Sequence, residues 1–124
     1  MLKEAVRAAH SRLLAAHGGA EGVRDTALLE SALARPHHRY VYGAPEMIDL
    51  SALYTASVVR NHPFVDGNKR TGFTIGIAFL ELNGFEFQAT EAEAIQAVFA
   101  LAAGDLDEDG YAKWLRSNAK PRKR

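Results

Sequence analysis

Residues 62–72, which read HPFVDGNKRTG, place a proton acceptor, a carboxylate and cations in one short segment. Histidine exchanges a proton near neutral pH, so His62 is a candidate general base. Asp66 offers the hard oxygen that Mg²⁺ prefers. Gly67 has no side chain to keep a ligand away from the backbone. Together these residue types suit the transfer of a charged group.

The charges that open the next helix point to an anion. The apolar segment 73–82 predicts a buried helix, and Asn68 is its candidate N-cap. Lys69 and Arg70 then fall in the first turn, where the helix dipole makes each added cation cost about 0.3–1 kcal/mol. Cations beside unpaired backbone N–H groups suit phosphate, and a polyphosphate matches the charge best. The alternative is a plain turn at 66–68 with both cations paired to surface carboxylates.

The spacing of apolar residues predicts an all-α fold, a compact bundle of about six helices. The expected helices cover residues 3–17, 27–34, 50–60, 69–82, 91–103 and a last segment from 107. Gly72 and Gly76 indicate that a neighbouring helix approaches the fourth segment closely, because glycine leaves room for another backbone.

Local signals predict where several helices begin and end. Besides Asn68, three residues are candidate N-caps: Asp25, Asp49 and Thr90, the last within a capping box. Pro36 is expected to end the second helix. Pro63 disfavours helical geometry at His62, so the third helix should stop near Asn61.

Two segments read as irregular. Residues 37–48 alternate weakly and contain a glycine and a proline, which fits either a short flap before the third helix or a simple surface connection. The two histidines there are expected to be solvated rather than metal ligands. Residues 119–124 are basic and are expected to form a disordered tail, which leaves one domain over residues 1–118.

The composition excludes several classes of protein. The 124 residues are 48% hydrophobic and 24% charged, with zero formal net charge and no cysteine. Disulfides and thiolate metal sites are therefore excluded, and nothing in the overall charge indicates a nucleic-acid or membrane partner. No uncharged run approaches the roughly 18 residues of a membrane span, and no signal peptide is apparent. A cytoplasmic location is expected.

Residues 62–72 resemble the signature of the Fic/Doc superfamily, His-x-Phe-x-(Asp/Glu/Asn)-(Gly/Ala)-Asn-x-Arg. The resemblance is greatest to the Doc (death-on-curing) branch, the toxins of type II toxin–antitoxin pairs. It extends to residues 22–36 and 79–84 and covers the chain except its basic tail. It implies the small all-α Fic bundle, with the motif between two core helices.

The resemblance also implies roles for individual residues. His62 would be the catalytic base toward a target hydroxyl, and Asp66 would bind Mg²⁺. The phosphates of ATP would lie on a loop of four residues: Gly67, Asn68, Lys69 and Arg70.

Two positions depart from the Fic pattern of AMP transfer. That pattern has glycine at Lys69 and a second arginine at Phe73. In Doc-like proteins the lysine accompanies an inverted ATP, whose γ-phosphate is transferred. The resemblance thus implies a protein kinase that phosphorylates a threonine of elongation factor Tu. AMP transfer and a catalytically silent binding module are the alternatives.

The resemblance further implies an antitoxin partner. Some Fic proteins carry an inhibitory helix with the pattern Ser/Thr-x-x-x-Glu-Gly/Asn. The nearest match, residues 26–31, fails at its last position, Ser31. The expectation is an antitoxin that acts in trans, through a C-terminal segment that folds on contact and masks the ATP site.

Overall fold

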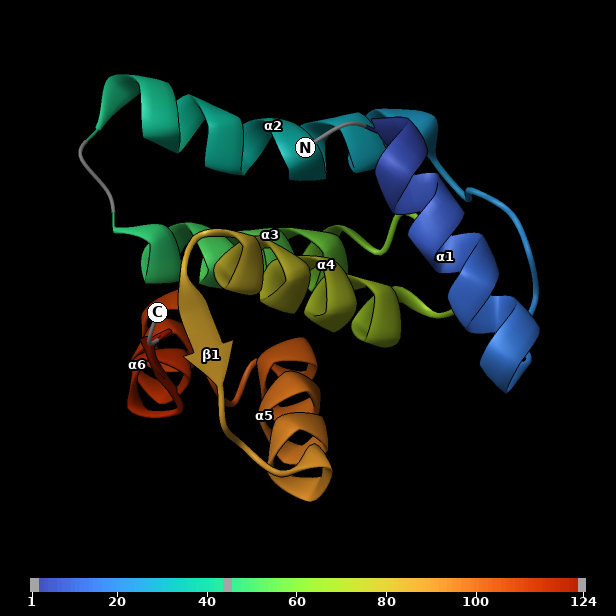
Figure 1. Cartoon of the computed structure of the whole chain (residues 1–124). Helices are drawn as coiled ribbons and strands as arrows, with labels where there is room; N and C mark the ends of the chain where they lie inside the picture. The colour runs from blue at the N-terminus through green and yellow to red at the C-terminus, as the bar shows by residue number, and fades with distance from the viewer. Residues whose placement is uncertain (1–2, 44–45, 123–124) are drawn as a thin grey trace.

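The computed structural model describes residues 3–43 and 46–122, and these residues have the expected all-α architecture. The helices are α1 (Lys3–His17), α2 (Thr26–Tyr42), α3 (Met47–Asn61), α4 (Asn68–Leu82), α5 (Glu91–Ala103) and α6 (Glu108–Ser117), and the strands are β1 (Phe85–Phe87) and β2 (Ala119–Pro121). The antiparallel α3 and α4 form a middle layer, with α2 on one side and α5 and α6 on the other (Figure 1). Among the described residues, none of the helices is long and apolar enough to span a bilayer.

The middle layer depends on the two glycines of α4. A Cβ on Gly76 would lie 2.1 Å from Thr55 Oγ1 and 2.9 Å from the carbonyl oxygen of Ser51. At Gly72 it would lie 3.1 Å from the carbonyl oxygen of Thr55. The hydroxyls of Ser51 and Thr55 donate to the carbonyls of Gly76 and Gly72, at 2.7 and 2.9 Å. The predicted close approach is confirmed, and small polar residues of α3 complete it.

The core lies on both sides of this layer. On one side α3 and α4 pack against α5 and α6, around Leu101, Tyr111 and Leu115. On the other side they pack against α1 and α2, around Val6 and Leu29. Of the two central helices α3 is the more deeply buried, since residues 50–59 are buried without interruption.

Most of the predicted helix ends are confirmed. Asp25 caps α2, and Thr90 caps α5 in a complete capping box. The prediction for Asp49 is wrong, because α3 begins at Met47 with Glu46 at the N-cap. Asp49 lies in the first turn and accepts a hydrogen bond from Arg116 at 3.1 Å.

The predicted break at Pro36 is also wrong. Pro36 lies inside α2, which continues to Tyr42, so residues 40–42 are helical and do not form a flap. Residues 44–45, within the segment predicted as a flap or connection, lie outside the described residues. A proline inside a helix costs about 3 kcal/mol. The ring of Pro36 is almost fully buried, and this packing offsets the lost backbone hydrogen bond.

The tail is ordered over its described part, in contrast to the prediction. Ala119–Pro121 forms β2, which pairs antiparallel with β1 and sets Lys120 opposite Glu86. Arg122 continues the attachment, since its backbone N–H donates to Gly84 O at 2.8 Å. Lys123 and Arg124 lie outside the described residues. Composition suggested disorder here, but the exposed edge of β1 supplies hydrogen-bond partners that composition does not reveal.

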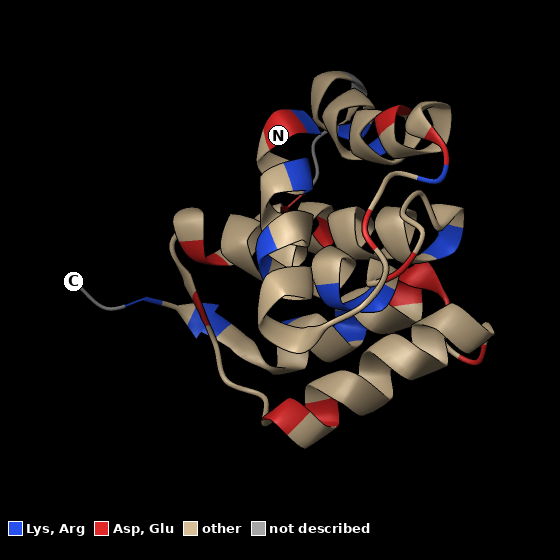
Figure 2. Cartoon of the chain, turned by 90° about the vertical axis from the view of Figure 1, so that its right-hand side faces the viewer, with Lys and Arg blue, Asp and Glu red and all other residues tan. Residues whose placement is uncertain are grey.

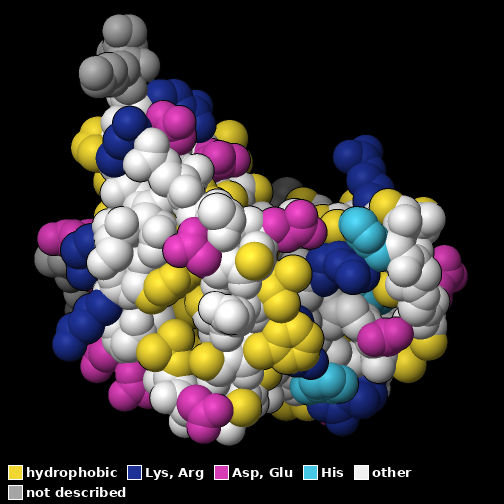
Figure 3. All heavy atoms as spheres, turned by 90° about the horizontal axis from the view of Figure 1, so that it is seen from below, with side chains coloured by type: hydrophobic (Ala, Val, Ile, Leu, Met, Phe, Trp, Pro, Cys, Tyr) yellow, Lys and Arg dark blue, Asp and Glu magenta, His cyan; other side chains and the backbone are white. Residues whose placement is uncertain are grey.

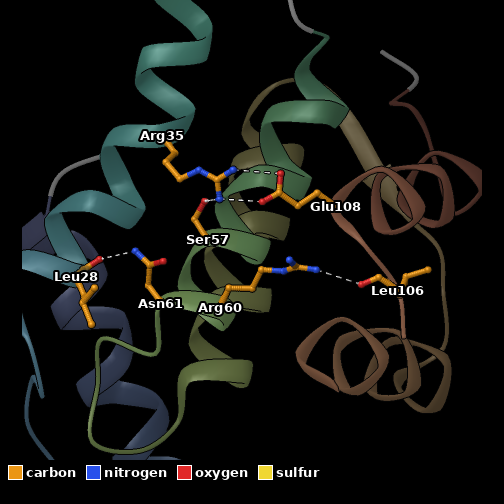
Figure 4. A network of polar contacts seen from close by, with 7 residues as sticks. All are labelled: Leu28, Arg35, Ser57, Arg60, Asn61, Leu106 and Glu108. Atoms are coloured by element: carbon orange, nitrogen blue, oxygen red, sulfur yellow. Dashed lines mark hydrogen bonds and ion pairs between the residues drawn. The ribbon is translucent and has the colours of Figure 1, made fainter. Parts of the chain in front are cut away.

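Polar contacts fasten the neighbouring helices to α3 (Figure 4). Arg35 of α2 donates to Ser57 Oγ at 3.3 Å and pairs with Glu108 of α6 at 2.8 Å. At the end of α3, Asn61 Nδ2 donates to Leu28 O of α2 at 3.0 Å. The last residue of α3 is thereby fixed immediately before the motif.

Candidate functional site

The motif forms the loop between α3 and α4, at the end of the middle layer beside α1 (Figure 1). His62 follows α3 directly, as predicted, and adopts the left-handed conformation with φ 52° and ψ 53°. It is the only non-glycine with positive φ among residues 3–43 and 46–122. Such conformations persist only where surrounding contacts enforce them, and they are frequent at functional sites. The His62 side chain is exposed to solvent.

Arg24 supplies the contacts that hold the backbone at His62. Its Nε donates to His62 O at 2.8 Å, and its Nη2 donates to Asn61 O at 3.2 Å. Both acceptors are backbone carbonyl oxygens at the C-terminus of α3, where carbonyls have no hydrogen-bond partner within the helix. Arg24 and His62 lie 38 positions apart, so no local sequence pattern indicates this contact.

The whole segment 22–25 runs beside the motif. Its N–H groups at Arg24 and Asp25 both donate to Pro63 O, at 2.7 and 3.1 Å. Val65 N donates to Gly22 O at 3.0 Å, around an antiparallel bridge between residues 23 and 64. The motif is therefore held by main-chain pairing as well as by its helices.

Asn68 closes the loop from within, and its predicted role as an N-cap is wrong. Its side chain accepts from Phe64 N at 2.9 Å and donates to Phe64 O at 3.0 Å. Gly67 occupies the N-cap position, and α4 has no side-chain cap. Because the Asn68 side chain is buried and fully engaged, only its backbone N–H remains for an anion.

Asp66 lies at the exposed tip of the loop, where backbone N–H groups surround its carboxylate. Gly67 N donates to Oδ1 at 2.8 Å, and Ala20 N donates to Oδ2 at 3.4 Å. A Cβ on Gly19 would lie 2.8 Å from Oδ2, so only glycine leaves room for this carboxylate. No cluster of three or more His, Cys, Asp or Glu side chains exists among the described residues that could hold a metal alone. The single carboxylate of Asp66 would suit Mg²⁺ whose other ligands are water molecules and phosphate oxygens, which is the usual coordination of this ion.

Lys69 and Arg70 lie in the first turn of α4, as predicted, and that turn contains no acidic residue. Neither side chain lies within ion-pair distance of a carboxylate in the part of the chain that the structure describes. The alternative in which surface carboxylates pair with both cations therefore does not hold for these residues. The Lys69 ammonium instead lies 5.1 Å from the ring centroid of Phe99 on α5, a cation–π distance.

These cations border a pocket of about 500 Å³ between α1, α4 and α5. Its apolar walls include Leu13, Phe73, Phe87, Val98 and Phe99, and its polar ones His17, Thr74 and Glu91. Figure 3 shows hydrophobic side chains gathered on this face, with cationic side chains among them. Over the molecule as a whole, cationic and acidic residues are interspersed, as Figure 2 shows, so the positive charge at this pocket is local.

His10 is the site residue that sequence reasoning missed. It lies outside the motif, yet it is buried and its Nε2 lies 2.7 Å from Asp66 O. The available signal was a histidine at the spacing of Val6 and Leu14, on the apolar face of α1. A buried polar group on such a face needs a hydrogen-bond partner.

Comparisons with known proteins agree with these features. The model of the Fic/DOC family matches residues 2–80. Toxin Doc of Mycolicibacterium smegmatis (strain ATCC 700084 / mc(2)155) is 40% identical over 99 residues, and the match covers 74% of this chain and 75% of that protein.

Proposed function

This chain belongs to the Fic/DOC family, and on that premise we propose that it is the toxin of a toxin–antitoxin pair. Its proposed reaction is transfer of the γ-phosphoryl group of ATP, with Mg²⁺, to a protein hydroxyl, expected to be a threonine of elongation factor Tu. One observation carries the proposal. A helix start with two unpaired cations opens onto a mostly apolar pocket, with an exposed histidine and carboxylate on the preceding loop.

ATP suits this combination of surfaces. Its base and sugar can occupy the apolar pocket, while the phosphates lie toward Lys69 and Arg70. Backbone N–H groups in the first turn of α4 lack helical acceptors and side-chain caps, so they are available to phosphate oxygens. The cation–π contact with Phe99 would yield to the stronger attraction of a phosphate for the Lys69 ammonium.

Mg²⁺ would be held by Asp66 together with phosphate oxygens and water. When bound, it would neutralise charge on the transferring phosphoryl group. Because the chain offers it one carboxylate here, we expect appreciable magnesium binding only in the presence of the nucleotide.

Residues of the motif would accept the proton of the target hydroxyl and stabilise the negative charge of the phosphates. His62 accepts the proton of the target hydroxyl as its oxygen bonds to the γ-phosphorus. The bond from that phosphorus to the bridging oxygen breaks, and ADP leaves with the electron pair. Lys69 and Arg70 stabilise the negative charge on the phosphates throughout.

AMP transfer is the second candidate, and Phe73 argues against it. In place of a cation that could hold phosphate, the chain has a ring that packs edge-on against Phe87, with centroids 5.6 Å apart. A silent binding module is the third candidate. The exposed His62 and Asp66 argue against it, as do Lys69 and Arg70, which pair with no carboxylate among the described residues.

Labelled ATP distinguishes these candidates. The protein is incubated with Mg²⁺, purified elongation factor Tu and ATP labelled at either the γ- or the α-phosphate. We expect label on elongation factor Tu from the γ position only, and none with His62→Ala. Label from the α position only would establish AMP transfer instead. No label from either position, with growth arrest retained in His62→Ala, would establish a binding role.

The antitoxin is proposed to cover the same pocket. Ile95 and Phe99 of α5 are 48% and 56% exposed and border it beside the cations of α4. An amphipathic segment with apolar and acidic side chains would match this surface. A small reading frame next to the gene should encode it. We expect its purified product to abolish ATP binding, and retained ATP affinity in the complex would contradict masking of the site.

A further inference from the structure

His10 contacts three residues of the motif loop from below. It lies on the inner face of α1 and is 3% exposed. Its ring stacks on Phe64, with centroids 3.8 Å apart and planes 8° apart. Two of its ring atoms, Cδ2 and Nε2, lie 3.6 Å from the point that a Cβ on Gly67 would occupy. One side chain thus forms part of the floor under residues 64–67.

The hydrogen bond of His10 has a defined direction. Nε2 lies 2.7 Å from Asp66 O, and a carbonyl oxygen can only accept. Nε2 therefore carries a hydrogen and donates it. Stacking on Phe64 fixes the plane of the ring, so the donor is aimed at this carbonyl.

The hydrogen bond from His10 to the carbonyl of Asp66 also orients the backbone N–H of Gly67. In a trans peptide the C=O and N–H groups point in opposite directions, and no peptide among the described residues is cis. With the Asp66 carbonyl turned inward to His10, the N–H of Gly67 points outward. It donates there to the carboxylate of Asp66, the proposed Mg²⁺ ligand, at 2.8 Å, so a bound phosphate oxygen would replace this carboxylate on the N–H.

We propose that His10 is a positioning residue that keeps the Asp66–Gly67 peptide oriented for phosphate. Without the Nε2 donor of His10, that peptide could turn its carbonyl outward, where the oxygen would repel phosphate. The inference rests on the proposed function for its ligand, ATP. By this inference a residue of α1, outside the motif, orients the N–H of Gly67 that would bind the anion.

Two substitutions separate the donor from the packing. His10→Gln places an amide donor at about the position of Nε2, whereas His10→Phe keeps a flat ring on Phe64 and removes the donor. We expect His10→Phe to weaken Mg·ATP binding about tenfold by calorimetry, the effect of one hydrogen bond. We expect His10→Gln to bind within about threefold of the unmodified protein. The KM for elongation factor Tu should not change in either.

Two outcomes would overturn the inference. One is unchanged ATP affinity in His10→Phe. The other is equal weakening in both variants in proportion to their loss of thermal stability, which a purely structural role predicts. If His10→Phe does not fold, His10→Asn replaces it, because its amide is too short to reach Asp66 O.

A second measurement separates failure of this inference from failure of the proposed function. Inorganic tripolyphosphate is titrated while the ¹H–¹⁵N signal of Gly67 is followed. We expect this signal to shift in the unmodified protein and in His10→Gln, and to shift less in His10→Phe. That difference requires an anion but no catalysis. If all three proteins respond alike, His10 does not orient this peptide.

Discussion

The side-chain amide of Asn68 bonds to both backbone polar groups of Phe64, at 2.9 and 3.0 Å. This pair of hydrogen bonds closes residues 64–68 into a ring that presents Asp66 and Gly67 at its tip. Phe64 is fully buried, so the closed loop is anchored in the core rather than resting on the surface. The exposed tip is thus connected rigidly to the interior.

Opening this ring should destabilise the protein. Asn68→Ala leaves the N–H and C=O of Phe64 buried without partners, which we expect to cost about 3 kcal/mol. Urea denaturation measures the loss. Asn83→Ala is the matched control, because it removes an exposed bond to Phe79 O and should cost well under half as much. Equal losses in the two variants would contradict the role of Asn68 in closing the loop.

The glycine contact between α3 and α4 should tolerate no side chain. Gly76→Ala would force a methyl group against Thr55 and the backbone of Ser51, and we expect a loss of about 2–3 kcal/mol in thermal or urea unfolding. Gly110→Ala in α6 is the control, since its nearest neighbour is the flexible end of Leu106. It should change stability by about 1 kcal/mol or less. A neutral Gly76→Ala would show that the central helices can separate freely.

Arg24 should affect the reaction through His62. Arg24→Ala removes the donors to the carbonyls of residues 61 and 62, and a displaced base should lower kcat roughly 10- to 100-fold. The KM for ATP should change little, because Arg24 does not line the nucleotide pocket. Steady-state kinetics with elongation factor Tu measures both. Arg122→Ala loses a similar bond, to Phe85 O, from a residue that does not line the pocket, and it should leave kcat unchanged. A rise in KM alone would assign Arg24 to binding.

The capping box of α5 should make stability depend on pH. Hydrogen bonds from the backbone and hydroxyl of Thr90 lower the pKa of Glu93. A carboxyl whose pKa is lower in the folded state than in the unfolded state stabilises the fold at pH values above its unfolded-state pKa. This contribution is lost as the pH falls through the folded-state pKa. We therefore expect the urea midpoint of the unmodified protein to be higher than that of the Glu93→Gln variant at pH 7. This difference should disappear as the pH falls toward 3. A constant difference across that range would exclude the ionised cap as its cause.

The sequence alone determined the features that depend on neighbouring residues. Asp25 and Thr90 cap helices because a capping side chain bonds to N–H groups two or three residues ahead. Pro63 excludes helical geometry at His62 through a clash with its direct neighbour. Lys69 and Arg70 lie in a first turn as predicted, although Asn68, the residue expected to cap that helix, does not cap it.

Only the tertiary structure decided how the motif is held. His10 reaches Asp66 across 56 positions, and Arg24 reaches His62 across 38. Pro36 stays helical because its ring is buried, and the basic tail is ordered because β1 offers an edge. Each outcome depends on the free energy of contacts between distant segments, which outweighs local propensity. The motif and its candidate site residues were therefore readable from the sequence, while the groups that hold the motif in place were not.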